Sequence, residues 1–85
     1  MKVKLLYFAA LREQLGTAGE ALELPAGVGT VTTLRSHLRG RGGAWELALA
    51  DSKLVRTAVN QDMAPPSAPV KAGDEVAFFP PVTGG

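Results

Sequence analysis

The sequence contains no cysteine and only one histidine among its 85 residues. Without cysteine, the chain can form no disulfide, no thiolate metal site and no cysteine nucleophile. The single histidine, His37, also excludes a metal site built from several histidines. Any sulfur that this protein handles therefore cannot be carried on a side-chain thiol.

An excess of one charge and a long apolar run are missing as well. Nine Lys and Arg residues against eight Asp and Glu residues give a formal net charge of +1. This balance argues against a nucleic-acid surface and against a polybasic membrane anchor. No apolar run approaches the ~18 residues of a membrane-spanning helix, and no signal-peptide cleavage pattern is visible. We therefore expect a cytoplasmic protein with neither nucleic acid nor membrane as a partner.

A phosphate-binding loop is also lacking. Residues 27–30 are glycine-rich and precede a predicted helix, but they have neither the Walker spacing nor its lysine. Residues 40–43 contain a single Arg-Gly-Gly element, which is too little for an RNA-binding segment and is typical of a loop between helices. We expect this chain itself to bind no cofactor and no ATP.

What the sequence does contain is an alternation of strands and helices that fits one domain. Strands are predicted at residues 2–8, 20–24, 54–60 and 75–79, helices at 9–15, 30–39 and 44–50, and a turn at 60–62. This order predicts an α+β roll, with helices on one face of a mixed sheet and the other face open. We expect residues 1–79 to form the domain and residues 80–85 to form an extended tail.

Large apolar residues fall on strand faces that charged residues mark as exposed. Lys4 and Glu75 lie on those faces of the first and last strands, and alternation places Phe8 and Phe79 on the same faces. Two interpretations remain open: the two aromatic rings cover each other, or they form a docking patch for a partner. Met63, just past the third strand, could join such a patch, because methionine adapts to many contact surfaces.

The C-terminal end carries the most specific pattern. Pro80-Pro81 ends the last strand, since proline donates no ladder hydrogen bond, and Val82-Thr83-Gly84-Gly85 follows. The two terminal glycines have no side chain, so this end could enter a narrow channel. The α-carboxyl of Gly85, with a reference pKa of ~3.3–3.7, is ionised at neutral pH. Such a carboxylate could attack the α-phosphorus of ATP and form an acyl-adenylate that is open to a sulfur nucleophile.

With its ending in view, the sequence resembles the small subunit of molybdopterin synthase, a ubiquitin-like sulfur-carrier family. The resemblance is carried by residues 73–85 (GDEVAFFPPVTGG), by residues 3–16 and by residues 58–61 (AVNQ). It covers essentially the whole chain in length and order. The ending is highly specific, whereas the middle of the chain is generic.

The resemblance implies a β-grasp fold and a sulfur-carrier role in molybdenum cofactor biosynthesis. An E1-like enzyme would use ATP to adenylate Gly85, and a sulfur donor system would convert it to a thiocarboxylate. The tail would then enter the large subunit of the synthase, in a heterotetramer, and give its sulfur to a cyclic pyranopterin phosphate. The residues expected to work or to touch partners are Phe8, Met63, Phe79, Pro80, Pro81, Val82, Thr83, Gly84 and Gly85.

Two other functions remain as alternatives. One is a carrier that supplies sulfur to another pathway, such as assembly of the thiamine thiazole. The other is a ubiquitin-like binding module or protein modifier without sulfur chemistry. In every case the chain is expected to be no catalyst on its own, because no nucleophile–base pair or metal cluster is visible.

Overall fold

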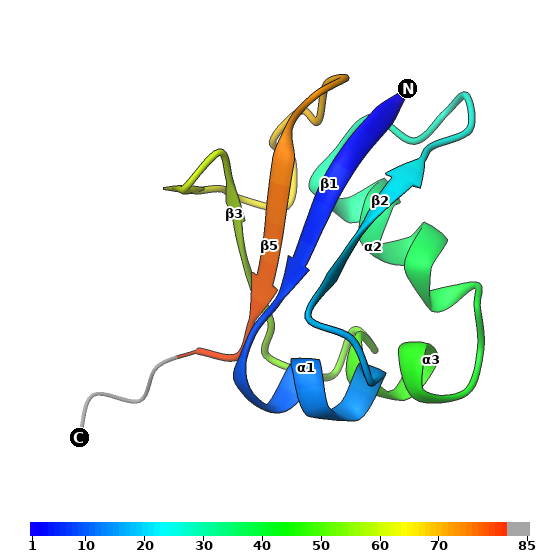
Figure 1. Cartoon of the computed structure of the whole chain (residues 1–85), viewed down its shortest axis with the longest axis vertical. Helices are drawn as coiled ribbons and strands as arrows, with labels where there is room; N and C mark the ends of the chain where they lie inside the picture. Colours follow the sequence, from blue (N-terminus) through cyan, green and yellow to red (C-terminus); the bar gives the residue numbers. More distant parts are fainter. Residues whose placement is uncertain (82–85) are drawn as a thin grey trace.

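The computed structural model describes residues 1–81 of the chain. Within this range, five strands and three helices follow one another along the chain, and Figure 1 labels all of them except β4. They are β1 (Lys2–Tyr7), α1 (Ala9–Leu15), β2 (Gly19–Glu23), α2 (Val31–Arg39), α3 (Ala44–Ala48), β3 (Arg56–Val59), β4 (Asp62–Met63) and β5 (Glu75–Phe79).

The strands form one mixed sheet in the order β2-β1-β5-β3-β4. The central pair, β1 and β5, is parallel, and the other three pairings are antiparallel. The last strand therefore lies in the middle of the sheet, between the first and the third. This arrangement confirms the predicted α+β roll with a mixed sheet.

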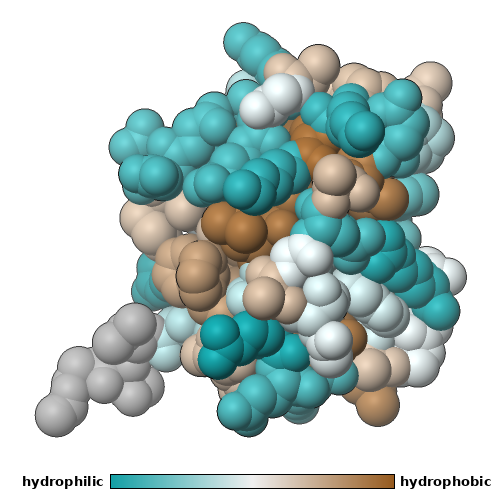
Figure 2. All heavy atoms as spheres, in the orientation of Figure 1, coloured by the Kyte–Doolittle hydropathy of each residue, from teal (hydrophilic) through white to brown (hydrophobic). Residues whose placement is uncertain are grey.

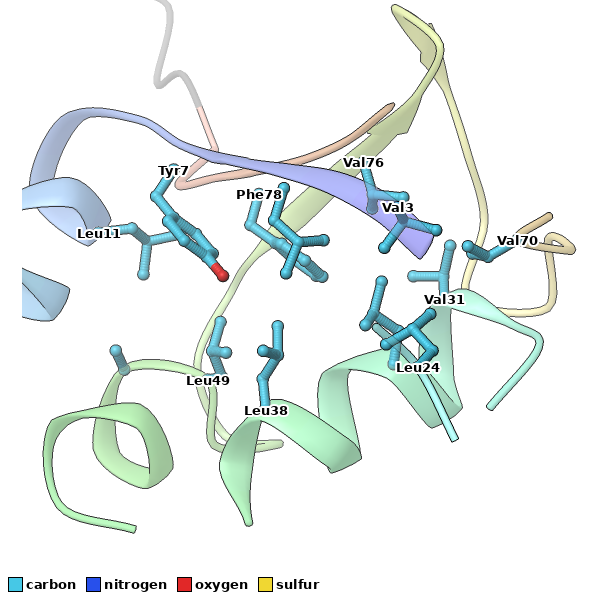
Figure 3. Packing of buried hydrophobic residues seen from close by; sticks show 13 residues of the cluster. Val3, Tyr7, Leu11, Leu24, Val31, Leu38, Leu49, Val70, Val76 and Phe78 are labelled. Carbon is cyan, nitrogen blue, oxygen red and sulfur yellow. The ribbon is translucent and has the colours of Figure 1, made fainter. Parts of the chain in front are cut away.

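One face of the sheet is covered by the helices. Val3, Leu5 and Tyr7 alternate along β1 and are at most 2% exposed, and Val76 and Phe78 of β5 are fully buried. Figure 3 shows the side chains of Val3, Tyr7, Val76 and Phe78 pointing from the sheet toward α2 and the segment around Leu49. Because alternate residues of a strand point to opposite faces, the same pattern leaves the other face of the central strands without a helical cover.

Helix α2 begins where the sequence predicts. The Thr30 hydroxyl accepts a hydrogen bond from the Thr33 backbone N–H (3.1 Å), and the Thr33 hydroxyl accepts one from the Thr30 N–H (2.9 Å). This reciprocal pair satisfies two N–H groups that the first turn leaves without helical partners. Val31, Leu34 and Leu38, spaced at i, i+3 and i+7, form one apolar stripe and are buried in the core.

Several predicted boundaries are wrong. Phe8 caps α1 instead of ending β1, β2 runs from Gly19 to Glu23, α3 stops at Ala48, and β3 spans only Arg56–Val59. The predicted turn at residues 60–62 extends one residue too far, because Asp62 begins the short strand β4. Asn60 and Gln61 form this turn with φ of 51° and 70°, the left-handed values of a two-residue hairpin loop.

Candidate functional site: the open sheet face and the base of the tail

The open face of the sheet carries a row of apolar residues in register. Leu6 of β1 lies opposite Ala77 of β5, Ala77 lies opposite Ala58 of β3, and Ala58 lies opposite Met63 of β4. Directly paired residues point to the same face, so the row crosses four strands. The two alanines in the middle of this apolar strip, Ala58 and Ala77, are only 8% and 7% exposed, so the exposed apolar surface comes from the longer side chains of Leu6 and Met63 at its ends.

The three predicted contact residues of the domain lie around this strip. Phe8 is 47% exposed and Met63 is 59% exposed, which is unusual for apolar side chains of this size. Phe79 is half-buried, and it lies opposite Arg56 at the end of β5. We refer to Leu6, Phe8, Ala58, Met63, Ala77 and Phe79 as the open-face patch.

The patch is continuous but wide. Because Tyr7 pairs with Phe78, the residues that follow them, Phe8 and Phe79, lie on adjacent segments of the backbone. Met63, in contrast, lies in a strand three strand spacings from β1, or about 14 Å away. Within residues 1–81, the aromatic ring pairs are Tyr7–Trp45 and Tyr7–Phe78, and Phe8 and Phe79 do not form one. The geometry thus favours a docking surface over two rings that simply cover each other.

Three members of the patch were missed from the sequence. Ala58 and Ala77 are too small to attract notice, and Leu6 is one of several apolar residues of its strand, between Lys4 and Phe8 on the same face. What joins them is the pairing register of β1, β5 and β3. The signal that could have found them is the alignment of AVNQ against EVAFF as antiparallel neighbours, which places one alanine opposite the other.

Charged residues surround the patch. Lys4 and Glu75 are paired across β1 and β5, one row beyond Leu6 and Ala77, and exposed Arg56 lies beside Phe79. Figure 2 shows the same distribution, with apolar atoms gathered over the middle of the sheet and hydrophilic residues around them. An apolar centre with a polar rim is the usual composition of a protein–protein interface.

A side-chain clamp fixes the beginning of β5. The Asn60 side chain donates to the Asp74 carboxylate (2.9 Å) and accepts from the Glu75 backbone N–H (3.0 Å), while the Lys71 N–H also donates to Asp74 (2.8 Å). The bonds from Asn60 and from the Lys71 backbone lower the pKa of Asp74 below its ordinary value. The clamp joins two of the segments that carry the family resemblance, so part of that resemblance reflects the fold.

The tail leaves from the centre of the sheet. β5 ends at Phe79, and Pro80 and Pro81 follow as half-buried residues outside any strand. The predicted residues Val82, Thr83, Gly84 and Gly85 lie outside the described residues. Phe79 of the open-face patch therefore lies at the end of β5 from which the tail starts.

Within residues 1–81, the structure contains no group of His, Cys, Asp or Glu side chains that could hold a metal ion. In the same part of the chain, no helix has the length and apolar character needed to cross a membrane. The glycine-rich segment at residues 27–30 directly precedes α2. The N–H groups of Gly29 and Thr30 both donate to the Thr33 hydroxyl. Those two donors are therefore already occupied within the chain.

Comparison with known proteins agrees with this arrangement. The molybdopterin synthase sulfur carrier subunit of Escherichia coli is 49% identical over 83 residues, covering 98% of this chain and 99% of the relative. The subunit of the same name from Haemophilus influenzae is 45% identical with the same coverage. Among solved structures, the small archaeal modifier protein SAMP1 of Haloferax volcanii superposes with a TM-score of 0.79 at 29% identity, covering both chains completely.

The likeness to SAMP1 confirms the predicted β-grasp fold, since it extends over the whole chain. In addition, the model of the ThiS family matches residues 5–85. That match includes residues 5–7 of β1, all of β5, the open-face patch and the terminal glycines. Together with the full-length relatives, it establishes that this chain belongs to the ThiS family.

Proposed function

We propose that this protein is the sulfur carrier of molybdenum cofactor biosynthesis and the small subunit of a molybdopterin synthase. The observation that carries this proposal is the 49% identity, over nearly the full length of both chains, to a molybdopterin synthase sulfur carrier subunit. The absence of cysteine agrees with it, because the sulfur must then be carried by the main chain at Gly85.

The chemistry begins at the C-terminal carboxylate. One oxygen of the Gly85 carboxylate attacks the α-phosphorus of ATP, pyrophosphate leaves, and the carbonyl carbon becomes an activated acyl-adenylate. Sulfide, HS⁻, delivered by a donor system then attacks that carbon. The C–S bond forms, the C–O bond to the phosphate breaks, and AMP leaves with its bonding electron pair. The product is a thiocarboxylate, which can give its sulfur to the cyclic pyranopterin phosphate. This chain supplies the reacting carboxylate, while an E1-like activating enzyme binds the ATP.

The domain supplies recognition. The open-face patch docks first on the activating enzyme and later on the large subunit of the synthase, with which the chain forms a heterotetramer. Because β5 carries both Phe79 and the tail, a partner that covers the patch also receives the tail at a defined point. Holding the reacting group in place in this way lowers the entropic part of the barrier.

Mass spectrometry tests the proposal directly. The chain is incubated with ATP, the E1-like enzyme and a sulfur donor, and its mass should rise by about 16 Da, as sulfur replaces one carboxyl oxygen. A variant that lacks Gly84 and Gly85 is the control and should gain no mass. The loaded chain, mixed with the large subunit, should convert the pyranopterin substrate to molybdopterin. A chain that gains no mass under these conditions would refute the sulfur-carrier function.

Protein modification is the second candidate, and the similarity to SAMP1 favours it. In that function the adenylated Gly85 carbonyl would be attacked by a lysine amine of another protein, forming an amide. The two candidates differ in their products, since a modifier becomes attached to larger proteins in a lysate supplied with ATP. A carrier for thiazole assembly is distinguished by complementation: we expect this gene to restore molybdopterin synthesis and not thiamine synthesis.

A further inference from the structure

The loop between α2 and α3 is tied to β2 and α3 by a single side chain. The Arg41 guanidinium donates two hydrogen bonds to the Glu20 carboxylate, at 2.7 and 2.8 Å, and lies 4.4 Å from the centre of the Trp45 ring. Gly42 and Gly43 follow with φ of 75° and 55°, values that strain other residues. The glycines thus let the chain turn between Arg41 and Trp45.

Glu20 also makes a hydrogen bond to a residue of the core. Its carboxylate accepts a hydrogen bond from the Tyr7 hydroxyl (3.1 Å), and Tyr7 is only 1% exposed. The Tyr7 and Trp45 rings form an edge-to-face pair, with their centroids 5.3 Å apart. The Tyr7 and Phe78 rings are stacked, with their centroids 6.3 Å apart. Figure 3 shows Tyr7 and Phe78 next to each other, with the hydroxyl pointing away from the sheet.

Phe78 is the residue through which the cluster reaches the tail. It is fully buried, its carbonyl accepts the Phe8 N–H (3.2 Å), and the next residue is Phe79 of the open-face patch. Only Phe79 separates it from Pro80, the first residue of the tail. A continuous series of contacts therefore runs from a surface loop to the base of the tail.

The cluster is stronger than an ordinary surface ion pair. Exposed pairs contribute little because water screens them and two long side chains must be ordered. In this case the side chains of Arg41 and Glu20 are only 31% and 26% exposed, both hydrogen bonds are made, and the guanidinium is held on an aromatic ring. Without Glu20, the buried Tyr7 hydroxyl would also lose its acceptor.

We propose that Arg41 is a positioning residue, which acts through Glu20, Tyr7 and Phe78 to fix the direction in which the tail leaves the sheet. This assigns a role to the loop at residues 40–43, and it rests on the proposed function, in which the tail is the working end. The open-face patch lies on the opposite face of the sheet from Tyr7 and Phe78. The cluster should therefore affect the placement of the carboxylate and leave docking unchanged.

Steady-state kinetics of thiocarboxylate formation test this proposal. Arg41→Met and Tyr7→Phe each break one link, and the second keeps the aromatic ring. Both variants should lower kcat by about tenfold with an unchanged KM for the carrier, because small misplacements of reacting groups are costly. Arg41→Lys keeps the charge but not the two-pronged hydrogen bonding, so its kcat should lie between those of wild type and Arg41→Met.

The control is Asp51→Asn, which removes the Arg39–Asp51 ion pair (3.0 Å) between the last residue of α2 and the segment that follows α3. It should keep wild-type kcat and KM. Assays run well below each variant's melting temperature exclude loss of folded protein as the cause. Wild-type kcat in Arg41→Met and Tyr7→Phe would overturn the positioning role, and so would a raised KM with unchanged kcat. If wild type itself gains no sulfur, the proposed function fails instead.

Discussion

Phe8 and Phe78 are aromatic residues of adjacent backbone segments with opposite surroundings. Phe8 is 47% exposed on the open face, whereas Phe78 is fully buried against Tyr7. We expect Phe8→Ala to weaken binding to the large subunit by ~2 kcal/mol or more with little change in the urea midpoint. Phe78→Ala should cost ~3–5 kcal/mol of folding free energy, because it leaves a cavity in the core.

Titration calorimetry and urea unfolding measure these two effects separately. Half-buried Phe79 is expected to lie between the two, with its Ala variant losing both affinity and some stability. Wild-type affinity in Phe8→Ala, with the partner folded and active, would show that the open-face patch is not the docking surface.

Glu20 makes the stability of the domain dependent on pH. The hydrogen bonds from Arg41, and then that from Tyr7, lower the pKa of Glu20 below its ordinary value of 4.5, although partial burial opposes them. The unfolded chain lacks these bonds, so it binds the proton at a higher pH than the folded chain does. The stabilisation is therefore complete above pH 4.5 and is lost as the pH falls through the lower folded pKa.

The measurement compares wild type with Glu20→Gln in urea at a series of pH values. Near neutral pH the variant should be less stable than wild type, and the difference should shrink below the ordinary pKa of Glu20. Asp74, whose pKa is also lowered, should contribute in the same direction in both proteins. Two stability curves that stay parallel from neutral to acid pH would contradict this account.

Residues that act through local patterning were predictable, and those that act across long loops were not. Alternation alone identifies the buried side of β1 and the exposed position of Phe8, because each strand follows a period of two. The Tyr7–Glu20–Arg41 cluster joins residues 13 and 21 positions apart. No local rule connects them, and Arg41 had been considered only as part of a weak RNA-binding element.

At the level of elements, β2 depends on a close approach of Gly19 to β1. A Cβ added at Gly19 would lie 2.5 Å from the Leu5 carbonyl oxygen, a backbone atom that cannot move without disturbing the pairing. We expect Gly19→Ala to destabilise the domain by about 1–3 kcal/mol, as overpacked sites commonly do. Gly29→Ala is a matched control, since its Cβ would meet no atom within 4 Å.

Urea unfolding of the two variants provides the test, and equal midpoints would show that β2 can shift without cost. The close approach also explains why the start of this strand was predicted incorrectly. Glycine is rarely found in strands, so the sequence predicts that this strand begins at Glu20. Its place in the strand is set by the pairing with Leu6, which is a tertiary feature.

The short strand β4 was missed for a related reason. Two residues carry no detectable alternation, and the following prolines are typical of an irregular segment. The strand exists because the turn at Asn60 and Gln61 returns the chain beside β3, where Ala58 pairs with Met63. That pairing places Met63 at the edge of the open-face patch, although its participation in the patch had been suggested from its chemistry alone.

At the scale of the whole molecule, the proposed function assigns recognition of the partner to the domain and the reacting carboxylate to the tail. The fold was predictable because the order of strands and helices and the family resemblance agree, and the terminal motif pointed to the working end. Neither the order of elements nor the terminal motif indicated that β1 and β5 are paired in parallel, yet this pairing places β5 between β1 and β3. In the proposed function, a sheet with its last strand at the centre would present the open-face patch and the start of the tail to the same partner.

The length of the tail should therefore control activity without affecting folding. Residues 80–85 can span up to ~20 Å, at ~3.3–3.6 Å per residue, and one added glycine moves the carboxylate by one such step. Since a misplacement of ~1 Å can cost ~10²-fold in rate, both a one-glycine extension and deletion of Gly85 should abolish sulfur transfer to the pterin. Gly84→Ala keeps the length but adds a Cβ at the narrow end.

All three variants should melt at the wild-type temperature, because they leave the core unchanged. Thiocarboxylate formation and pterin conversion are measured for each, and full activity of the extended or shortened chain would mean that the carboxylate of Gly85 is not the working group.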